Sequence, residues 1–423
     1  MHRKYLMGNK TRLAMAFSAI LALVAFSTSA QAASKDVVIG NILPLSGSSA
    51  SVGIQGKQMR ELIIDKFNAA GGIKCDGALN GSKIKMIYLD TRSDPTVGVT
   101  DVQQLISQDH VDLITGAWNS GVTYPATQIA EMNKIPFVVP VSVMDRITER
   151  GFKYTFRVAA KDSWWTKDQF KFVDYLAHKS SAKIKTLGFV YVNNDFGKSF
   201  DDAWVKLAKK HGYKVVLNQS YRESATDLTP VVLKMKSTKP QIVLLVSDAA
   251  DAILLQNTMA SYDVHPLALI SSGGGQADPA FIKNTGDSAR YLFDVSEWST
   301  DMNRPGLKEL NKSYKKRFGA DINGESMDAY IGMHTILTTL QNTCSTDPDK
   351  FRHAMLNTEF KGGPFSVMAY PSVKFDKTGQ NVNAGLIMVQ IRKVGNKYER
   401  VTVYPEQDTR AGYKIVFPQP NHY

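Results

Sequence analysis

Short apolar runs alternate with longer amphipathic stretches from Asp36 onward. "DVVIGNILPLSG" is typical of a buried strand, and "GIQGKQMRELIIDKFNAAGG" predicts an amphipathic helix that glycines end. The alternation continues through "KIKMIYLDTRSD", "PTVGVTDVQQLISQDH", "VDLITGAWNS", "PATQIAEMNK" and "IPFVVPVS". Strands that alternate with helices of ten or more residues predict a parallel sheet with helices on both faces.

The same alternation restarts after "KYTFRVAAKDSWW". The apolar runs "TLGFVYVNN", "KVVLNQSY", "QIVLLVSD" and "LALISSGGG" alternate with helical segments and predict a second α/β unit of similar size. A long apolar helix follows in "SMDAYIGMHTILTTLQNT", and the end of the chain predicts hairpins. The fold class is therefore α/β, with two doubly wound parallel-sheet lobes and no low-complexity linker between them.

The N-terminus has the three parts of a secretory signal peptide. "MHRKYLMGNKTR" is basic, "LAMAFSAILALVAF" is apolar, and Ala30-Gln31-Ala32 offers a small-residue cleavage site. The apolar run is shorter than a membrane-spanning helix requires, which argues against a retained anchor. We therefore predict that residues 1–32 are a signal peptide and that the mature chain is periplasmic.

Charge and composition narrow the classes of partner. Removal of residues 1–32 would lower the formal charge from +12 to +8, because this segment holds four basic and no acidic residues. The remaining basic residues are scattered in groups such as Lys209-Lys210, without a basic stripe of interleaved aromatics. This pattern indicates solvated helix faces rather than a nucleic-acid surface.

Cysteine usage suggests one covalent link. Cys75 and Cys344 both lie in the exported part of the chain. Two cysteines in an oxidising compartment are a candidate disulfide, and the sequence leaves open whether they lie within bonding distance.

The chain lacks the usual catalytic and metal-binding motifs. Gly197-Lys198-Ser199 resembles the end of a phosphate-binding loop, but Val192 stands where the first glycine is required. "SSGGGQ" lacks dinucleotide-binding spacing and suggests a flexible or close-packed loop. His334 lies on an apolar helix, and no histidine belongs to a metal-ligand pattern. We therefore expect neither a cofactor nor a metal, and no enzymatic activity.

Polar residues gather at the carboxyl ends of the predicted strands. These ends are "PLSGSSASVG", "GAWNSGV", "VPVSVMD", "VNNDFG", "LLVSDAA" and "ISSGGG". Open α/β sheets bind ligands outside these ends, and the amides of a helix N-terminus favour an anion. A single such end would be explained as a turn or helix cap. Six of them without catalytic motifs favour a binding protein.

"VVIGNILPLSGSSASVGIQGKQMRELIIDKFNAAGGI" resembles the N-terminus of the periplasmic leucine/isoleucine/valine-binding proteins of ABC importers. The resemblance continues through "DTRSDP", "GAWNSGVTYPA", "FRVAAKD", "NNDFGKSF", "ATDLTPVVLKMKSTKPQIVLL" and "VKFDKTGQ". It implies the type I periplasmic binding fold, whose two lobes are joined by three crossovers and close over a ligand. Lobe 1 would comprise residues 33–157 and 294–372, and lobe 2 residues 158–293 and 373–423.

The resemblance also implies a set of ligand-binding residues. Ser120 and its neighbouring amides would hold a ligand carboxylate, and Phe196 would supply an aromatic wall. With Trp118 and Asn119, which the strand end itself offers beside Ser120, the candidate ligand-binding residues are Trp118, Asn119, Ser120, Ser142, Val143, Phe196, Asp248 and Gly274.

Two departures from the family bear on the ligand. Val143 has no hydroxyl, and Gly273–Gly274 stand where the family has an acidic residue that holds an ammonium group. Asp248 offers a replacement anion from a different place. Trp118, Trp164, Trp165 and Trp298 lie in or near segments that end at the cleft, and tryptophan suits flat or apolar ligands. We expect a small aromatic or aliphatic carboxylate ahead of an amino acid, with an uncharged polar ligand left open.

The family implies a monomer that delivers its small-molecule ligand to an ABC permease in the inner membrane. A ligand-sensing receptor component of the same fold is the alternative. An exported hydrolase would need a base within reach of Ser120 or Ser142, and no histidine is near either in the sequence. His334 is a distant candidate.

Overall fold

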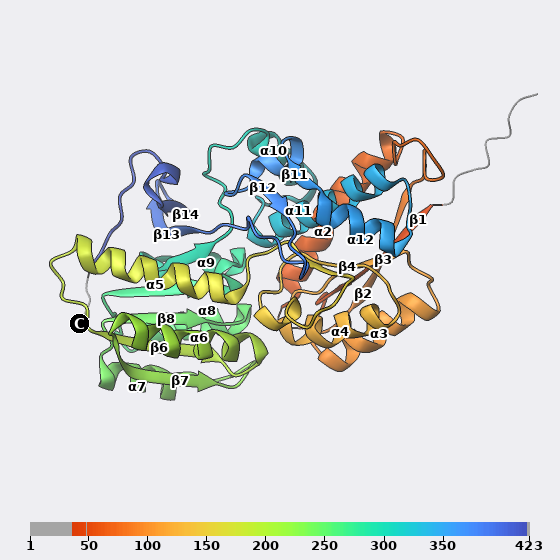
Figure 1. The fold of residues 1–423 in the computed structure, drawn as a ribbon. Helices are drawn as coiled ribbons and strands as arrows, with labels where there is room; N and C mark the ends of the chain where they lie inside the picture. Colours follow the sequence, from red (N-terminus) through yellow and green to blue (C-terminus); the bar gives the residue numbers. More distant parts are fainter. Residues whose placement is uncertain (1–35, 48, 421–423) are drawn as a thin grey trace, which may run out of the picture. The chain divides into compact units, whose positions relative to one another are not determined.

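The computed structural model describes residues 36–47 and 49–420, so the predicted signal peptide lies outside the described residues. Within these ranges, no helix combines the length and the apolar character that a membrane crossing requires. Two large sheets organise this part of the chain (Figure 1).

The first sheet is parallel throughout, with strand order β2-β1-β3-β4-β5. Its strands are β1 Val37–Leu43, β2 Ile84–Asp90, β3 Leu113–Gly116, β4 Phe137–Val139 and β5 Thr155–Arg157. The helices between them are α2 Ala50–Ala69, α3 Pro95–Ser107 and α4 Ser120–Met132. The alternating pattern of the N-terminal third therefore predicted this sheet correctly.

The second sheet has the order β14-β13-β10-β9-β8-β6-β7. Its parallel strands are β6 Thr186–Val192, β7 Lys214–Tyr221, β8 Ile242–Val246, β9 Ala268–Ser272 and β10 Phe293–Ser296. An antiparallel hairpin, β13 Ile387–Val394 and β14 Lys397–Tyr404, extends one edge. The associated helices are α5 Asp162–Lys179, α6 Asp195–His211, α7 Thr229–Thr238, α8 Ala249–Ser261 and α9 Pro279–Thr285.

A later segment contains α10 Leu307–Phe318, α11 Gly324–Thr343, α12 Pro348–Asn357, β11 Glu359–Lys361 and β12 Ser372–Lys374. It returns to the side of the first sheet, where α11 packs on α2 (Figure 1). We call it, together with the first sheet and its helices, the first lobe; the second sheet and its helices form the second lobe. Short 3-10 turns complete the chain: η1 Asp145–Ile147, η2 Gly274–Ala277, η3 Gly286–Ala289, η4 Gly363–Val367 and η5 Glu406–Asp408.

The chain crosses between the lobes three times: after β5, after β10, and between β12 and β13. Two predicted boundaries need correction. The boundary at residue 294 falls inside β10, because Phe293 pairs with Ile270 of β9 and the strand belongs to the second sheet. The boundary at residue 373 falls inside β12, which pairs with β11 of the first lobe.

Local sequence explains why the strands and helices form where they do. All five residues of β8, "IVLLV", are buried, as expected for a strand covered by helices on both faces. Asn194 caps the N-terminus of α6, where its Oδ1 accepts the Gly197 amide at 3.0 Å, and Gly212 caps the C-terminus in the left-handed conformation. Its buried face includes Phe200 and Trp204, which pack beneath the second sheet.

A disulfide joins Cys75, in the segment that follows α2, to Cys344 at the C-terminal end of α11. Their Cα atoms lie 5.6 Å apart, although 269 positions separate them in the sequence. Because α2 and α11 pack together, the bond links two distant segments of the same lobe.

Replacement of both cysteines, Cys75→Ser with Cys344→Ser, should lower the free energy of unfolding by about 2–5 kcal/mol, because the bond restrains a long loop in the unfolded chain. Denaturant unfolding of the oxidised wild type and the double variant measures this difference. The reduced wild type should match the double variant. Equal midpoints for the oxidised wild type and the double variant would contradict the expectation.

Candidate ligand-binding site

One cavity of about 300 Å³ lies where the carboxyl ends of the two sheets meet. It is lined by residues that follow strands of both lobes, and its volume falls at the lower end of the range of small-molecule sites. In both sheets the strand order changes direction beside the first strand, between β1 and β3 and between β6 and β8. Such switch points are where open α/β sheets bind ligands.

All eight predicted ligand-binding residues line this cavity: Trp118, Asn119, Ser120, Ser142, Val143, Phe196, Asp248 and Gly274. Of the other tryptophans considered, only Trp165 is also a lining residue. Trp298 is buried in the core of the first lobe, and Trp164 packs against the core of the second. The structure thus brings the predicted residues together, while their contact with a ligand stays a prediction.

The N-terminus of α4 forms one wall of the cavity. Ser120 is the first residue of the helix and is 3% exposed, and its Oγ accepts the Met144 amide at 3.4 Å. Asn119 precedes it without capping the helix through its side chain, and its buried Oδ1 receives no hydrogen bond from the described residues. The first amides of a helix have no intrahelical acceptor, so this end can hold an anion.

The ends of β3 and β4 are fixed to each other through Ser142. Its hydroxyl donates to the Trp118 carbonyl at 2.9 Å and lies 2.5 Å from the Thr123 hydroxyl of α4. Thr123 was not a predicted site residue. These bonds hold the Ser142 hydroxyl within the protein, so Ser142 positions the wall that carries Ser120.

The glycine run of the second lobe is a close-packed turn. Gly274 has a φ of +59°, and a Cβ there would lie 2.8 Å from the Ser247 carbonyl oxygen and 3.3 Å from the Phe196 ring. A Cβ on Gly273 would lie 3.3 Å from the Trp165 ring. Of the two interpretations drawn from the sequence, close packing is therefore the correct one: these glycines let two aromatic rings reach the cavity.

Asp248 is almost fully buried at the cavity, with 1% of its surface exposed. It accepts a hydrogen bond of 3.2 Å from the Asn194 side chain. Burial, together with the neighbouring Glu223 and Asp251 carboxylates, raises the pKa of Asp248 to about 7. The group therefore binds a proton more readily than an exposed aspartate does.

Glu297 is a cavity residue that sequence reasoning missed. It follows β10 at the second crossover and is 4% exposed. Its Oε1 accepts the Ala160 amide at 2.5 Å. Burial raises the pKa of Glu297 to about 7, with the Asp328 side chain as its hydrogen-bonding neighbour. Nothing in the local sequence marks this position, because a tertiary contact creates its environment.

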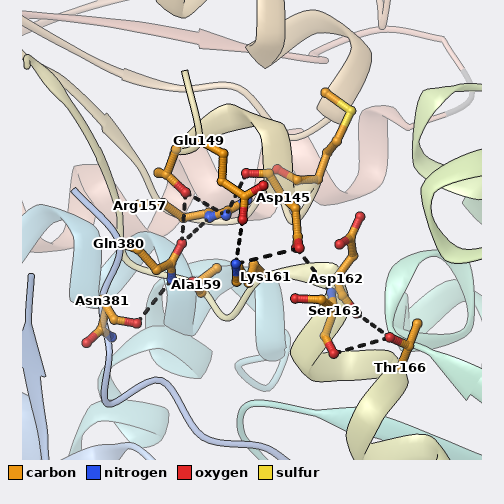
Figure 2. Close-up of polar contacts among 12 residues, drawn as sticks. Asp145, Glu149, Arg157, Ala159, Lys161, Asp162, Ser163, Thr166, Gln380 and Asn381 are labelled. Atoms are coloured by element: carbon orange, nitrogen blue, oxygen red, sulfur yellow. Dashed lines mark hydrogen bonds and ion pairs between the residues drawn. The ribbon is translucent and has the colours of Figure 1, made fainter. Parts of the chain in front are cut away.

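A buried arginine joins the cavity wall to the crossovers (Figure 2). Arg157 donates from Nε to Gln380 Oε1 at 2.7 Å and from Nη1 to the carbonyls of Met144, at 2.6 Å, and Ser142, at 3.3 Å. Gln380 in turn donates to the Ala159 carbonyl at 2.8 Å. The first and third crossovers are thus tied to each other and to the segment that ends at the cavity.

Charged side chains surround the start of α5 at the first crossover (Figure 2). Lys161 pairs with Glu149 at 2.6 Å and with Asp145 at 3.6 Å. Burial and the neighbouring Asp145 raise the pKa of Asp162 well above its usual range. The Asp145 and Asp162 carboxyl groups come from different lobes and influence each other at this point.

The hydrolase hypothesis called for a histidine within reach of Ser120 or Ser142. No histidine is present among the described residues that line the cavity. His334 packs its ring against Tyr330 within α11, with 4.3 Å between the ring centroids, and burial lowers its pKa to about 4.

Comparison with known proteins identifies the family. A model of the periplasmic binding protein family matches residues 36–396, and the chain belongs to this family. The Leu/Ile/Val-binding protein homolog 7 of Brucella abortus (strain 2308) is 27% identical over 415 residues, which cover 94% of this chain and 98% of the relative. The predicted resemblance to branched-chain amino acid-type substrate-binding proteins of ABC transporters is thereby confirmed.

Solved structures share the fold. The solute-binding protein of an ABC transporter from Rhodopseudomonas palustris BisB5, in complex with 3,4-dihydroxybenzoic acid, has a TM-score of 0.76 at 22% identity and covers 87% of this chain and 96% of its own. The branched-chain amino acid binding protein LivJ from Streptococcus pneumoniae, in complex with isoleucine, has a TM-score of 0.72 at 19% identity, with 87% and 99% covered. The predicted type I periplasmic binding fold is therefore confirmed.

The raised pKa of Asp248 predicts a pH dependence of stability. At pH values between the unfolded pKa near 4 and the folded pKa of about 7, Asp248 binds a proton in the folded protein but not in the unfolded chain. The free energy of unfolding therefore falls as the pH rises through this window. Asp248→Asn removes the ionisation. The variant should gain stability relative to the wild type as the pH rises from 5 to 7, by about 1.4 kcal/mol per pH unit.

Denaturant unfolding of the ligand-free protein at pH 5 and pH 7 measures this difference. Asp202→Asn, on the exposed face of α6, is the matched control and should follow the wild type at both pH values. A constant difference between Asp248→Asn and the wild type would show that Asp248 is already ionised at pH 5.

Proposed function

We propose that the protein is an exported solute-binding protein that captures a small organic ligand between its lobes and delivers it to an ABC importer. The observation that carries this proposal is the cavity at the carboxyl ends of both sheets, lined from both lobes. Membership of the periplasmic binding protein family supports the same role. In this function the chain is a periplasmic monomer that performs no chemical step on its ligand.

The ligand is proposed to carry a carboxylate, either as an amino acid or as a small aromatic or aliphatic acid. The free amides at the N-terminus of α4 and the Ser120 hydroxyl supply donors for that group. The molecules bound by the two structural relatives, isoleucine and 3,4-dihydroxybenzoic acid, both contain a carboxyl group. The rings of Trp118, Trp165 and Phe196 would pack against the apolar part of the ligand.

Delivery is proposed to depend on closure of the lobes over the ligand. Contacts already cross between the lobes beside the cavity: Ser51 donates to Asp278 at 3.1 Å, and a Cβ on Gly121 would lie 3.3 Å from the Asp195 carboxylate. The permease would then recognise the rims of both lobes together.

The ligand class can be tested with the mature protein, refolded to remove any ligand carried from expression. Thermal-shift screening against amino acids, aromatic acids and short-chain carboxylates should raise the melting temperature by several degrees for at least one carboxylate, because a ligand that binds only the folded state stabilises it. Absence of any change in melting temperature across the carboxylates would contradict the proposed ligand class.

Ser120→Ala should weaken binding of the carboxylate found in that screen by about 1–3 kcal/mol, because a hydrogen bond to a charged group is lost. Isothermal titration calorimetry measures the affinity. Ser107→Ala, an exposed helical serine at the end of α3, is the matched control and should bind as the wild type does. Unchanged affinity in Ser120→Ala would remove this hydroxyl from the binding site.

A further inference from the structure

The second sheet has another edge, opposite the one that borders the cavity. The carboxyl ends of β6, β8 and β9 lead to the cavity residues Phe196, Asp248 and Gly274. The amino ends of the same parallel strands lie at the opposite edge, together with the carboxyl ends of the helices that precede them. The connections along this edge are residues 177–186, 209–214, 236–241 and 262–267.

These four connections are rich in lysine. They contain eight lysines and a single acidic residue, Asp263, which gives them a net charge of +7. This charge accounts for nearly all of the +8 of the mature chain. The lysines are scattered along the sequence, and the parallel order of the strands gathers them at one edge. We call them the lysine surface, and all of them are exposed: Lys179, Lys183, Lys185, Lys209, Lys210, Lys214, Lys236 and Lys239.

Hydrogen bonds place the connections side by side. The Lys214 amide donates to the Lys185 carbonyl at 2.8 Å. The Lys185 amide in turn donates to Gln241 Oε1 at 2.6 Å. Lys236 Nζ donates to the Tyr262 carbonyl at 2.7 Å, which joins the third connection to the fourth. The lysines therefore belong to one continuous surface.

Helix ends account for only part of this surface. Positive charge in the last turn of a helix offsets the helix dipole. This explanation applies to the lysines in the last turns of α5, α6 and α7, which are Lys179, Lys209, Lys210 and Lys236. It does not apply to Lys183, Lys185 and Lys214, which lie at the starts of β6 and β7. No carboxylate of a described residue lies within 4.0 Å of these three amino groups, so their charge is available to a partner.

The carboxylates that border the lysine surface have partners of their own. They are Asp174, which accepts a hydrogen bond of 2.7 Å from Tyr213, Asp263, which lies 3.1 Å from His265, and Glu406, which lies 3.9 Å from Lys179. Exposed pairs of this kind offset little charge. The lysines therefore dominate the electrostatic potential at this edge.

Two exposed apolar side chains lie beside the lysines. Leu233 of α7 is 46% exposed, and Tyr262, which follows α8, is 37% exposed. Leu233 is three positions before Lys236 on the same helix face, and Lys236 bonds to the backbone of Tyr262. Lysine combined with exposed leucine and tyrosine is typical of surfaces that bind at the headgroup region of a membrane. Lysine, as a compact point charge, also suits a surface of many phosphates better than the bidentate recognition of one group.

We infer that the lysine surface docks the exported protein on an anionic phospholipid membrane, with the lysines against the lipid phosphates and with Leu233 and Tyr262 at the boundary of the acyl chains. The surface and the cavity lie at opposite edges of one sheet, so lipid and small ligand occupy separate sites. The inference goes beyond the proposed function and does not depend on the identity of the ligand.

Co-sedimentation of the mature protein with vesicles tests the inference. Vesicles of phosphatidylcholine and phosphatidylglycerol in equal parts should bind the protein at least about tenfold more tightly than vesicles of phosphatidylcholine alone. An increase in salt from about 0.05 M to about 0.5 M should remove this binding, because salt screens exposed charges. Both measurements use the wild type, so they do not depend on the folding of any variant.

Charge reversal locates the docking surface. The triple variant Lys183→Glu, Lys185→Glu and Lys214→Glu should bind the anionic vesicles at least about tenfold more weakly than the wild type. The matched control makes the same change in net charge at three exposed lysines of α10 in the first lobe, by Lys308→Glu, Lys312→Glu and Lys316→Glu, and should bind nearly as the wild type does. Thermal unfolding followed by circular dichroism shows whether both variants are folded.

The apolar contribution distinguishes a membrane from another anionic partner. Leu233→Ser should weaken vesicle binding by about threefold at constant charge, because apolar area leaves water on docking. Val205→Ser is the matched control, since Val205 of α6 is 45% exposed outside the lysine surface.

Equal binding to both kinds of vesicle, or equal loss of binding in the two triple variants, would overturn the inference. Binding to soluble polyglutamate as tight as binding to vesicles, without an effect of Leu233→Ser, would point to an acidic macromolecule and would also overturn it. These outcomes leave ligand capture in the cavity standing, because the thermal-shift screen tests that function separately.

Discussion

The buried guanidinium of Arg157 is the interaction on which the arrangement of the site depends. Arg157 is completely buried, and burial lowers its pKa only to about 10, so it remains charged at neutral pH. A buried charge is tolerated only where hydrogen bonds replace its hydration. Here the acceptors are the Ser142 and Met144 carbonyls, Thr148 and Gln380. The hydrogen bonds of the Arg157 side chain therefore hold both the segment after β4 and the third crossover in place.

The same segment carries the polar wall of the cavity. Met144 donates its amide to Ser120, and Ser142 bonds to the Trp118 carbonyl, so the backbone that Arg157 fixes also fixes the N-terminus of α4. On the opposite wall, glycines at 273 and 274 allow aromatic rings to approach. One wall is thus ordered by hydrogen bonding and the other by close packing.

The sequence was sufficient for the sheets and for the strand ends that line the cavity, because local periodicity and turn chemistry determine both. It predicted Ser120, Ser142 and Gly274 as lining residues for this reason. It did not predict Glu297, because that residue lies in a crossover without a motif, and its burial arises from contacts with Ala160 and with Asp328 of α11. The glycine run stands where the family has its acidic residue, and Asp248, which the sequence offered as a replacement anion, lines the cavity.

The position of Glu297 joins the cavity to the connections between the lobes. Glu297 lies in the second crossover, and its Oε1 accepts the Ala160 amide of the first crossover. The carboxyl group at the cavity therefore links two of the three connections between the lobes. Since Gln380 ties the third crossover to Ala159, all three connections meet within a few residues of one another. The segment that borders the cavity at Glu297 is therefore held by the same contacts that join the three connections.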